Sequence, residues 1–498
     1  MRRICLSLFF ITTSLTAYTT GLNADFNSRC IEIQQHLYSL KLKNAEKLLE
    51  LEVSQNPENV TADYLYVIHD LLKVLVSESP ESFEQFHKRS SQAIKRLDAY
   101  DQKDVHGHFY KQEIYFYSSV VQGKSGNAVS AANDIRLSYK YGQKIISDYP
   151  DYLPAYKTLG LIHAGFGNLP TTYRKLVSML GYTGSTDKGI EELQSFILAS
   201  AKKPEWKWMQ KEASLYLAAI KLYLKNDRET AWTLVDRLTS SETPSPLMTF
   251  VRSNFADKCK KNDEVIKTLK NTPKDAAFED IPHLDFLMGT AKLQRLDQDA
   301  SVYLLRYLSR YKGSSYIKSC YQKLAWNSLI NNDVKSYKSY MNKLQLNGNL
   351  NLEEDQQAQM EARRNEMPDS RLLKSRLLFD GGYYPEALSG IRLLQAEDFT
   401  STNLKTEYCY RKARIYHQLN DFELAEAFYK AAILTGEKST LYYASYSCLY
   451  LAELYEKNGK SAVANTYFKK ATSLKDNKEY KNSIEHRAKA GLQRLKQQ

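Results

Sequence analysis

The stretch CYRKARIYHQLNDFELAEAFYKAAI, residues 409–433, decides the fold, because two other segments repeat its pattern. They are LLKSRLLFDGGYYPEALSGIRLLQ at 372–395 and CLYLAELYEKNGKSAVANTYFKKAT at 448–472. The three segments align on Ser375, Ala413 and Ala452, which are spaced 38 and then 39 residues apart. Equivalent residues recur at four further offsets: Leu378, Tyr416 and Tyr455; Ala387, Ala425 and Ala464; Ile391, Tyr429 and Phe468; and Leu394, Ala432 and Ala471.

Small and large residues in this order are typical of paired helices. Small residues mark the places where two helices cross closely, and large residues fill the space between one pair and the next. Short polar turns at 380–385, 419–422 and 457–460 join the helices. The pattern resembles the tetratricopeptide repeat, with a period longer than the usual ~34 residues. It predicts an all-α fold, a right-handed superhelical solenoid of tetratricopeptide-like helical hairpins.

Weaker copies of the pattern extend toward the amino terminus. Ala219 and Ala231 stand in the same phase in one copy, and a second copy keeps Ala325 but has Tyr337 where alanine is expected. Ala45 belongs to a third copy. The predicted divisions are a divergent helical-repeat region at 25–346 with a glycine-rich fold-back at 165–193, a polar linker or solvated helix at 347–370, and a C-terminal repeat array at 371–498.

The amino terminus is typical of an export signal. Arg2 and Arg3 precede a mostly apolar stretch that is too short to span a bilayer, and Ala24 precedes the expected mature start at Asp25. We therefore expect a signal peptide at 1–24 and a periplasmic or envelope location. A cytoplasmic protein is the alternative.

Composition agrees with an extended helical array. The 498 residues are too many for one compact core, and 12 prolines are few enough to allow long helical runs. The 37 tyrosines suit contacts between helices that remain partly accessible to water, because the ring is apolar and the hydroxyl is polar. The net charge of +12 permits an anionic partner. Lysine and arginine are interleaved with acids and form no dense run with aromatic residues, which disfavours nucleic acid as the partner.

The segment GFGNLPTTYRKLVSMLGYTGSTDKGIEEL, residues 165–193, contains five of the chain's 20 glycines. A phosphate loop would end in Gly-Lys-Ser/Thr, but glycine follows Lys188, so the segment predicts no nucleotide site. We interpret it as a helical fold-back instead. In that interpretation Gly165 and Gly167 end one helix, Pro170 begins the next, Gly181 and Gly184 form a turn, and Ser185 or Thr186 caps a third helix with Ile190, Leu193 and Ile197 on its inner face.

The same segment resembles a known signature. Its pattern is carried by Asn168, Leu169, Lys175, Leu176, Leu180, Gly181, Tyr182, Gly184, Gly189 and Leu193. This is similar to the eukaryotic family that contains tetratricopeptide repeat protein 39 and the yeast inclusion-body clearance protein. The resemblance implies a non-enzymatic adaptor with a link to lipid or protein-quality handling.

Candidate chemistry is sparse. His106 and His108, with Asp104 nearby, could ligate a metal, but no second cluster with ligand spacing accompanies them, and they are equally consistent with ordinary polar surface. The five cysteines after the leader contain no CxxC pair and are predicted to be buried small residues: Cys30, Cys259, Cys320, Cys409 and Cys448. We therefore expect a protein that is not an enzyme, with no cofactor and no metal.

In the repeat register, the first helix of each pair lines a concave groove. The predicted partner-binding residues are Leu372, Arg376, Phe379, Tyr410, Arg414, His417, Glu453 and Glu456, with Leu449 at the remaining equivalent position. Arg376 and Arg414 are equivalent in adjacent repeats, and arginine suits a carboxylate partner, although solvated surface charges would look the same in sequence. We expect an unidentified protein or peptide partner, with a membrane-surface adaptor as the alternative.

Overall fold

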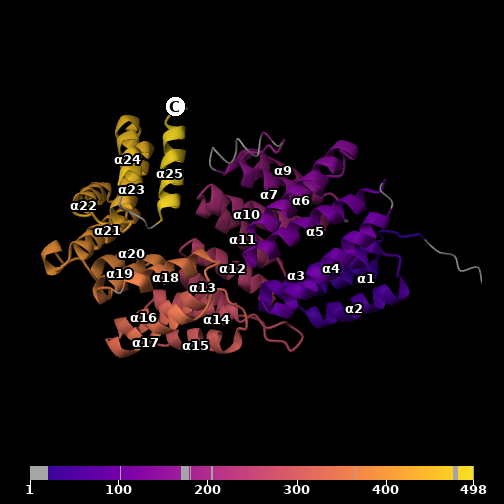
Figure 1. Ribbon diagram of the computed structural model, residues 1–498, viewed down its shortest axis with the longest axis horizontal. Helices are drawn as coiled ribbons and strands as arrows, with labels where there is room; N and C mark the ends of the chain where they lie inside the picture. Colours follow the sequence, from indigo (N-terminus) through magenta and orange to yellow (C-terminus); the bar gives the residue numbers. More distant parts are fainter. Residues whose placement is uncertain are drawn as a thin grey trace, which may run out of the picture.

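The computed structural model describes residues 21–100, 103–169, 179, 181–203, 206–364, 366–474 and 480–496, with only the backbone of 482. In these ranges the chain is all-α, and an isolated β-bridge pairs Asn23 with Asn59. Each helix packs mainly against the next one in the chain, so the fold is a series of antiparallel hairpins. Figure 1 shows the N-terminal helices at one end of an elongated molecule and the C-terminal helices at the other.

The N-terminal half contains α1 Ser28–Tyr38, α2 Leu42–Gln55, α3 Val60–Ser77, α4 Pro80–Ala99, α5 Val105–Lys124, α6 Ala128–Asp148, α7 Ala155–Gly167, α9 Thr186–Ser200, α10 Lys207–Ala219, the π-helix η2 Ile220–Leu224 and α11 Arg228–Ser241. The middle contains α12 Pro246–Lys258, α13 Asn262–Lys270, α14 His283–Gln294, α15 Ala300–Arg310, α16 Ile317–Ile330, α17 Val334–Leu346 and α18 Glu353–Arg364. The C-terminal part contains α19 Ser370–Gly381, α20 Tyr384–Ser389, the 3-10 turn η3 Ala396–Asp398, α21 Thr402–Gln418, α22 Phe422–Thr435, α23 Tyr443–Lys457, α24 Ser461–Ser473 and α25 Lys481–Arg494.

An Asn-Asp pair forms the turn in three of the hairpins. Asn420 has a φ of +62°, and the side chain of the following Asp421 accepts a hydrogen bond from the backbone of α22. Asn226–Asp227 and Asn332–Asp333 repeat this arrangement at the start of α11 and α17. Asparagine tolerates the left-handed conformation and aspartate is a favoured helix N-cap, so this local sequence specifies a reversal of the chain.

The repeat register predicted from the sequence is confirmed in the C-terminal hairpins. Ala425 and Ala464 are fully buried, and so are Tyr429 and Phe468 at the large positions. Ser375 is also buried, and its Oγ donates a hydrogen bond to the carbonyl oxygen of Ala387 at 2.9 Å. Small residues therefore lie where paired helices cross.

The upstream copy around α10 departs from that register. The prediction placed Ala219 at the helix crossing, but Ala218 is the fully buried residue and Ala219 is only partly buried. The reason is η2, which follows directly and contains the wider turn of a π-helix. A π-turn inserts one residue relative to the α-helical phase.

The segment predicted as a polar linker or solvated helix at 347–370 contains α18. One face of α18 is buried, including Asp355 and Ala358, and the helix packs against α16 and α17. Asp355 accepts hydrogen bonds from the backbone N–H groups of Tyr316 at 2.7 Å and Ser319 at 2.9 Å. This carboxylate therefore fastens α18 to the start of α16.

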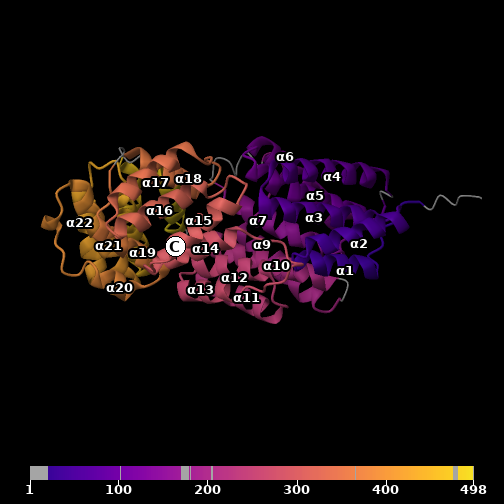
Figure 2. The same cartoon turned by 90° about the horizontal axis from the view of Figure 1, so that it is seen from below.

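The array folds back on its own beginning. In the loop between α13 and α14, the N–H of Glu279 donates to the carbonyl oxygen of Leu40 at 2.7 Å. Further along, Ser315 Oγ donates to Glu78 at 2.9 Å. Figure 2 shows the middle helices between the two ends of the molecule. The middle hairpins are thus anchored to the first hairpins by backbone and side-chain bonds.

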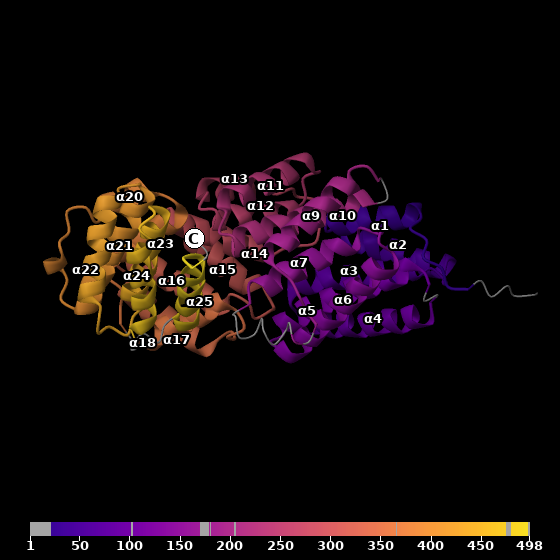
Figure 3. The same cartoon turned by 90° about the horizontal axis from the view of Figure 1, so that it is seen from above.

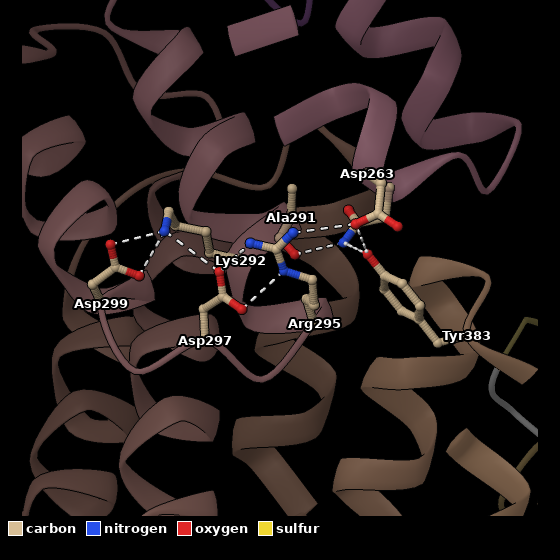
Figure 4. Close-up of polar contacts among 8 residues, drawn as sticks. Asp263, Ala291, Lys292, Arg295, Asp297, Asp299 and Tyr383 are labelled. Atoms are coloured by element: carbon tan, nitrogen blue, oxygen red, sulfur yellow. Dashed lines mark hydrogen bonds and ion pairs between the residues drawn. The ribbon is translucent and has the colours of Figure 1, made fainter. Parts of the chain in front are cut away.

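A second long-range junction attaches the C-terminal array to α13. Tyr383 Oη donates to Asp263 at 2.8 Å and accepts from Asn262 Nδ2 at 3.2 Å. Gly382 has a φ of +91°, and a Cβ there would lie 2.3 Å from the carbonyl oxygen of Lys260. In Figure 4, Asp263 also faces Arg295 at 3.2 Å, at one end of a row of ion pairs. The predicted polar turn at 380–385 is therefore the place where the C-terminal array contacts α13 and the residues just before it.

Part of the glycine-rich fold-back lies outside the described residues, namely 170–178 and 180. Helix α7 continues through Gly165 and ends at Gly167, so of the two glycines predicted to end this helix it is Gly167 that does. Gly181 has the predicted turn conformation with a φ of +81°, and Ser185 is the N-cap of α9. Leu193 is fully buried on the inner face of α9.

The predicted leader falls largely on residues 1–20, which lie outside the described residues. None of the described helices is long and apolar enough to cross a bilayer.

Candidate binding groove

A polar cavity of about 590 Å³ lies on the inner side of the array. Its walls come mainly from α12, α14, α16, α18 and α19, together with Tyr442 and Tyr443 at the start of α23. Because α19 packs against both α14 and α16, the cavity is enclosed by hairpins that are far apart in the sequence. We call this cavity the groove.

Ion pairs and hydrogen bonds satisfy most acids of the groove. Glu361 accepts from Trp326 Nε1 at 2.6 Å and from Gln322 Nε2 at 2.9 Å. Glu354 lies 3.5 Å from Lys258 Nζ. These acids are therefore occupied by neighbours within the fold.

One lysine of the groove has no such acid. Lys323 Nζ donates to Ser319 Oγ at 2.8 Å and lies 5.1 Å from the ring centroid of Phe286, and no carboxylate of the described residues pairs with it. Burial lowers the pKa of the Lys323 amine below its ordinary value, although Glu354 and Asp257 oppose the shift. Lys323 thus places an amine without a carboxylate partner among the described residues in the groove wall.

The predicted residue Arg376 lines the groove. Its guanidinium stacks over the Trp326 ring at 4.5 Å and lies 3.6 Å from Glu361. It is also 3.9 Å from Asp380. Arg376 is therefore at the predicted position, but its charge is already shared with two acids of the fold.

Arg414 differs from Arg376 in its partners. Its guanidinium lies 4.0 Å from the centroid of Tyr450 and 4.9 Å from that of Phe379, and it donates to Tyr410 Oη at 3.1 Å. Within the described ranges no carboxylate forms an ion pair with it. Aromatic faces hold the guanidinium in place and leave most of its N–H donors without an acid.

The charge of Arg414 changes the ionisation of its neighbours. Burial opposes ionisation of Tyr450, yet Arg414 and Arg487 hold the pKa of this hydroxyl below its ordinary value. Burial, together with Arg414 and Lys457, lowers the pKa of His417 to about 4. Arg414 contributes to the lowering of both pKa values.

The remaining predicted residues lie in less accessible places. Leu372, Phe379 and Tyr410 are buried in helix seams, with exposures of 1%, 8% and 4%. Large side chains at these offsets fill the space between hairpins, and all three belong to one buried apolar cluster. His417 is partly buried, and its Nδ1 lies 3.1 Å from Tyr429 Oη.

Glu453 and Glu456 face the last helix. Arg487 of α25 donates to both oxygens of Glu453 at 2.7 and 2.9 Å. Arg494 of α25 donates to Glu456 at 2.7 Å. Figure 3 shows α23, α24 and α25 side by side. The equivalent face that carries Arg414 on α21 is thus covered on α23 by α25.

Sequence reasoning missed the contribution of the middle helices, although a signal was present. If the groove offsets are applied to the weak copy aligned on Ala325, they select Gln322, Trp326 and Leu329. The first two residues line the groove. No repeat offset pointed to the acids of α18, because this helix does not belong to any of the repeat copies recognised in the sequence.

The structure adds a second, apolar cavity of about 330 Å³ between α5, α6, α7 and η2. Its lining includes Phe116, Ile162 and Ile220, which are buried, and Tyr223, which also lines the groove. In the sequence these residues are indistinguishable from ordinary core positions.

The candidate metal residues do not form a cluster. His106 Nδ1 lies 2.8 Å from Asp104, and the described part of the chain contains no group of three or more His, Cys, Asp or Glu side chains placed to hold an ion. Cys30, Cys320 and Cys409 are buried, as predicted, and Cys448 is buried as well, whereas Cys259 is partly exposed.

The fold and groove define a class of protein, the helical-repeat binding scaffold. Stacked helical hairpins of this kind present concave surfaces to protein partners and are typically not catalytic. The tetratricopeptide repeat family model matches residues 406–434, which cover most of α21 and α22. This chain therefore contains a tetratricopeptide repeat, at the segment that carries the pattern most clearly.

Comparison with curated proteins gave no match. Among solved structures, the chain is similar to the crystal structure of yeast Tom70, with 10% identity, a TM-score of 0.25, and coverage of 94% of this chain and 89% of that one. It is also similar to the structure of Naa15/Naa10 bound to HypK-THB, with 11% identity, a TM-score of 0.20, and coverage of 94% and 78%. At these scores the likeness carries no argument, and the fold assignment rests on the hairpins themselves.

Proposed function

We propose that this protein is a non-enzymatic adaptor that binds an extended, acidic segment of a protein partner along the groove. The observation that carries the proposal is Arg414, which does not itself line the groove but stands on α21 at the position equivalent to the groove residue Arg376. Its guanidinium has three aromatic neighbours and no carboxylate partner among the described residues. A carboxylate of the partner would complete its charge-assisted hydrogen bonds. Lys323 offers a further amine donor in the groove wall.

The size of the groove agrees with a peptide segment as the ligand. A cavity of about 590 Å³ is within the range of pockets that enclose several side chains of a ligand. Its wall alternates rings such as Trp326 and Phe286 with charged groups, and aromatic residues and arginine are enriched where proteins recognise one another. Arg376 would contribute by holding Trp326 and Glu361 in place.

The test begins with affinity purification of the tagged protein from its native cells and mass spectrometry of the captured proteins. Direct binding of the leading candidate is then measured for the wild type, Arg414→Gln and the control Arg392→Gln. Arg392 is exposed and does not line the groove. Loss of binding only in Arg414→Gln supports the proposal, and equal binding by all three proteins refutes it.

We also propose that the protein is exported, with residues 1–24 removed as a signal peptide. The basic residues Arg2 and Arg3 before the apolar stretch motivate this part of the proposal. Mass spectrometry of the protein isolated from its native envelope should give an amino terminus near Asp25. An intact Met1 in a cytosolic fraction would contradict export.

The resemblance of 165–193 to the tetratricopeptide repeat protein 39 family suggests the alternative of a membrane-surface adaptor. Co-sedimentation with vesicles that contain anionic lipid separates the two functions. Binding to the vesicles that is unaffected by Arg414→Gln would favour the alternative.

A further inference from the structure

The apolar cavity has an unusual wall. Phe116 of α5, Ile162 of α7 and Ile220 of η2 form buried parts of the lining, while Gly165 of α7 is exposed. A Cβ on Gly165 would meet no atom within 4 Å. The absence of a side chain at Gly165 therefore leaves the cavity open on this side.

The π-helix accounts for the presence of the cavity at this place. Its extra residue shifts Ala219 away from the helix crossing and onto the cavity wall. It also places Tyr223, which is 62% exposed, between the apolar cavity and the groove, since Tyr223 lines both. π-turns inside α-helices are frequently found at functional sites.

We propose that this cavity receives one large apolar side chain, such as phenylalanine, from the same protein segment that lies in the groove. This inference rests on the proposed function. Because the two cavities lie on either side of Tyr223, the polar part of the segment would stay in the groove while one side chain enters the apolar cavity. Recognition by an apolar anchor beside a polar track is a recurring mode of peptide binding.

The volume of the cavity, about 330 Å³, is sufficient for one large apolar side chain. The neighbouring polar groove, which shares Tyr223 with the cavity, favours a side chain of a protein segment over a lipid. Burial of a phenylalanine side chain is expected to tighten binding by about ten- to a hundredfold.

Gly165→Leu is the variant that tests the cavity, because Gly165 lines it and a Cβ at this position would meet no atom within 4 Å. Gly123→Leu is the matched control. Gly123 is also an exposed helical glycine with no atom within 4 Å of an added Cβ, and it does not line the cavity.

The probes are two fluorescein-labelled acidic nonapeptides that differ only in a central phenylalanine or serine. We expect the phenylalanine peptide to bind the full-length protein at least about tenfold more tightly than the serine peptide. Gly165→Leu should abolish this difference without weakening the serine peptide, and Gly123→Leu should retain it. Equal binding of both peptides to the wild type would overturn the anchor and leave the groove proposal standing. A phenylalanine preference that survives in Gly165→Leu would also overturn the anchor.

A second measurement separates failure of the anchor from failure of the groove. The methyl NMR signals of Ile135, Ile162 and Ile220 should shift on addition of N-acetylphenylalaninamide in the wild type but not in Gly165→Leu. These shifts, in the absence of binding by either peptide, would support the cavity and refute the acidic groove ligand. A response to dodecanoate with none to N-acetylphenylalaninamide would overturn the side-chain assignment in favour of a lipid.

Discussion

Gly160 of α7 and Gly189 of α9 lie face to face where the two helices cross. A Cβ on Gly189 would lie 2.2 Å from the carbonyl oxygen of Gly160, and a Cβ on Gly160 would lie 2.9 Å from that of Gly189. Only glycine permits this approach of two backbones. The glycine content of this part of the chain therefore reflects close helix packing as well as turns.

This crossing predicts opposite effects for two glycine substitutions. Gly189→Ala should lower the free energy of unfolding by about 1–3 kcal/mol, because the added methyl group meets the α7 backbone. Gly165→Ala should instead raise it, by up to ~1 kcal/mol, because nothing obstructs the methyl group and alanine favours the helix. Urea unfolding measures both values. Equal effects of the two substitutions would contradict the packing described here.

The repeat register predicts that Ala425→Leu is destabilising. Ala425 is fully buried at a helix crossing, and overpacking such a site costs about 1–3 kcal/mol. Ala427→Leu is the matched control in the same helix, since Ala427 is exposed and its substitution should change stability by less than about 0.5 kcal/mol. Ala464→Leu should behave like Ala425→Leu, with exposed Ala462 as its control. Unchanged thermal unfolding of both buried variants would mean that the register is wrong.

A buried charge network in the N-terminal half predicts a large effect at Lys157. Lys157 Nζ is fully buried and donates to Glu113 and, at 2.5 Å, to Glu212. Lys157→Met would leave two carboxylates together without a cation and should cost about 3–5 kcal/mol in urea unfolding. The triple variant that adds Glu113→Gln and Glu212→Gln should recover much of this loss. A Lys157→Met protein as stable as the wild type would contradict the network.

The variants Arg376→Gln and Arg414→Gln are expected to differ in their effect on stability. Arg414→Gln should weaken an acidic partner by about tenfold or more, the loss expected for charge-assisted hydrogen bonds worth about 1.5–3 kcal/mol. Arg376→Gln should also lower the thermal unfolding temperature, because Glu361 would lose its cation and Trp326 its stacking partner. Charge reversal at both positions should abolish binding. Full binding by the double variant would place the functional surface elsewhere on the molecule.

Two histidines predict a loss of stability in acid. Burial and Lys124 lower the pKa of His283 to about 3, and burial and Arg414 lower that of His417 to about 4, against about 6.5 in the unfolded chain. The unfolded state therefore binds more protons below pH 6.5, so this stabilisation is present above pH 6.5 and is lost as pH falls toward 4 and then 3.

The measurement is urea unfolding between pH 7 and pH 4. His417→Gln should reduce the slope of unfolding free energy against pH by up to about 1.4 kcal/mol per pH unit, the value for one proton. His283→Phe should do the same and retain contacts with Phe286 and Tyr316. A slope that is unchanged in the double variant would contradict neutral burial of these rings.

The groove could be predicted only in part. The offsets of the repeat selected Arg376, which lines the groove, and also Arg414, which does not, because helical periodicity fixes only the side of a helix that a residue occupies. They could not show that α25 covers Glu453 and Glu456, or that α18 supplies acids to the opposite wall. Those contacts depend on which hairpins meet in space.

The sequence by itself determined the all-α hairpin fold, the phase of the C-terminal repeats and several of the turns. These features are local: Asn420 and Asp421 reverse the chain, and Ala425 fits a crossing only about twelve residues from its partner Ala413. Only the tertiary structure decided where the array closes, through Gly382 against Lys260 and Ser315 against Glu78. The position of the π-turn beside the apolar cavity was also visible only in the tertiary structure. Such contacts join residues far apart in the chain, and their energy depends on shape and charge in three dimensions, which local periodicity does not encode.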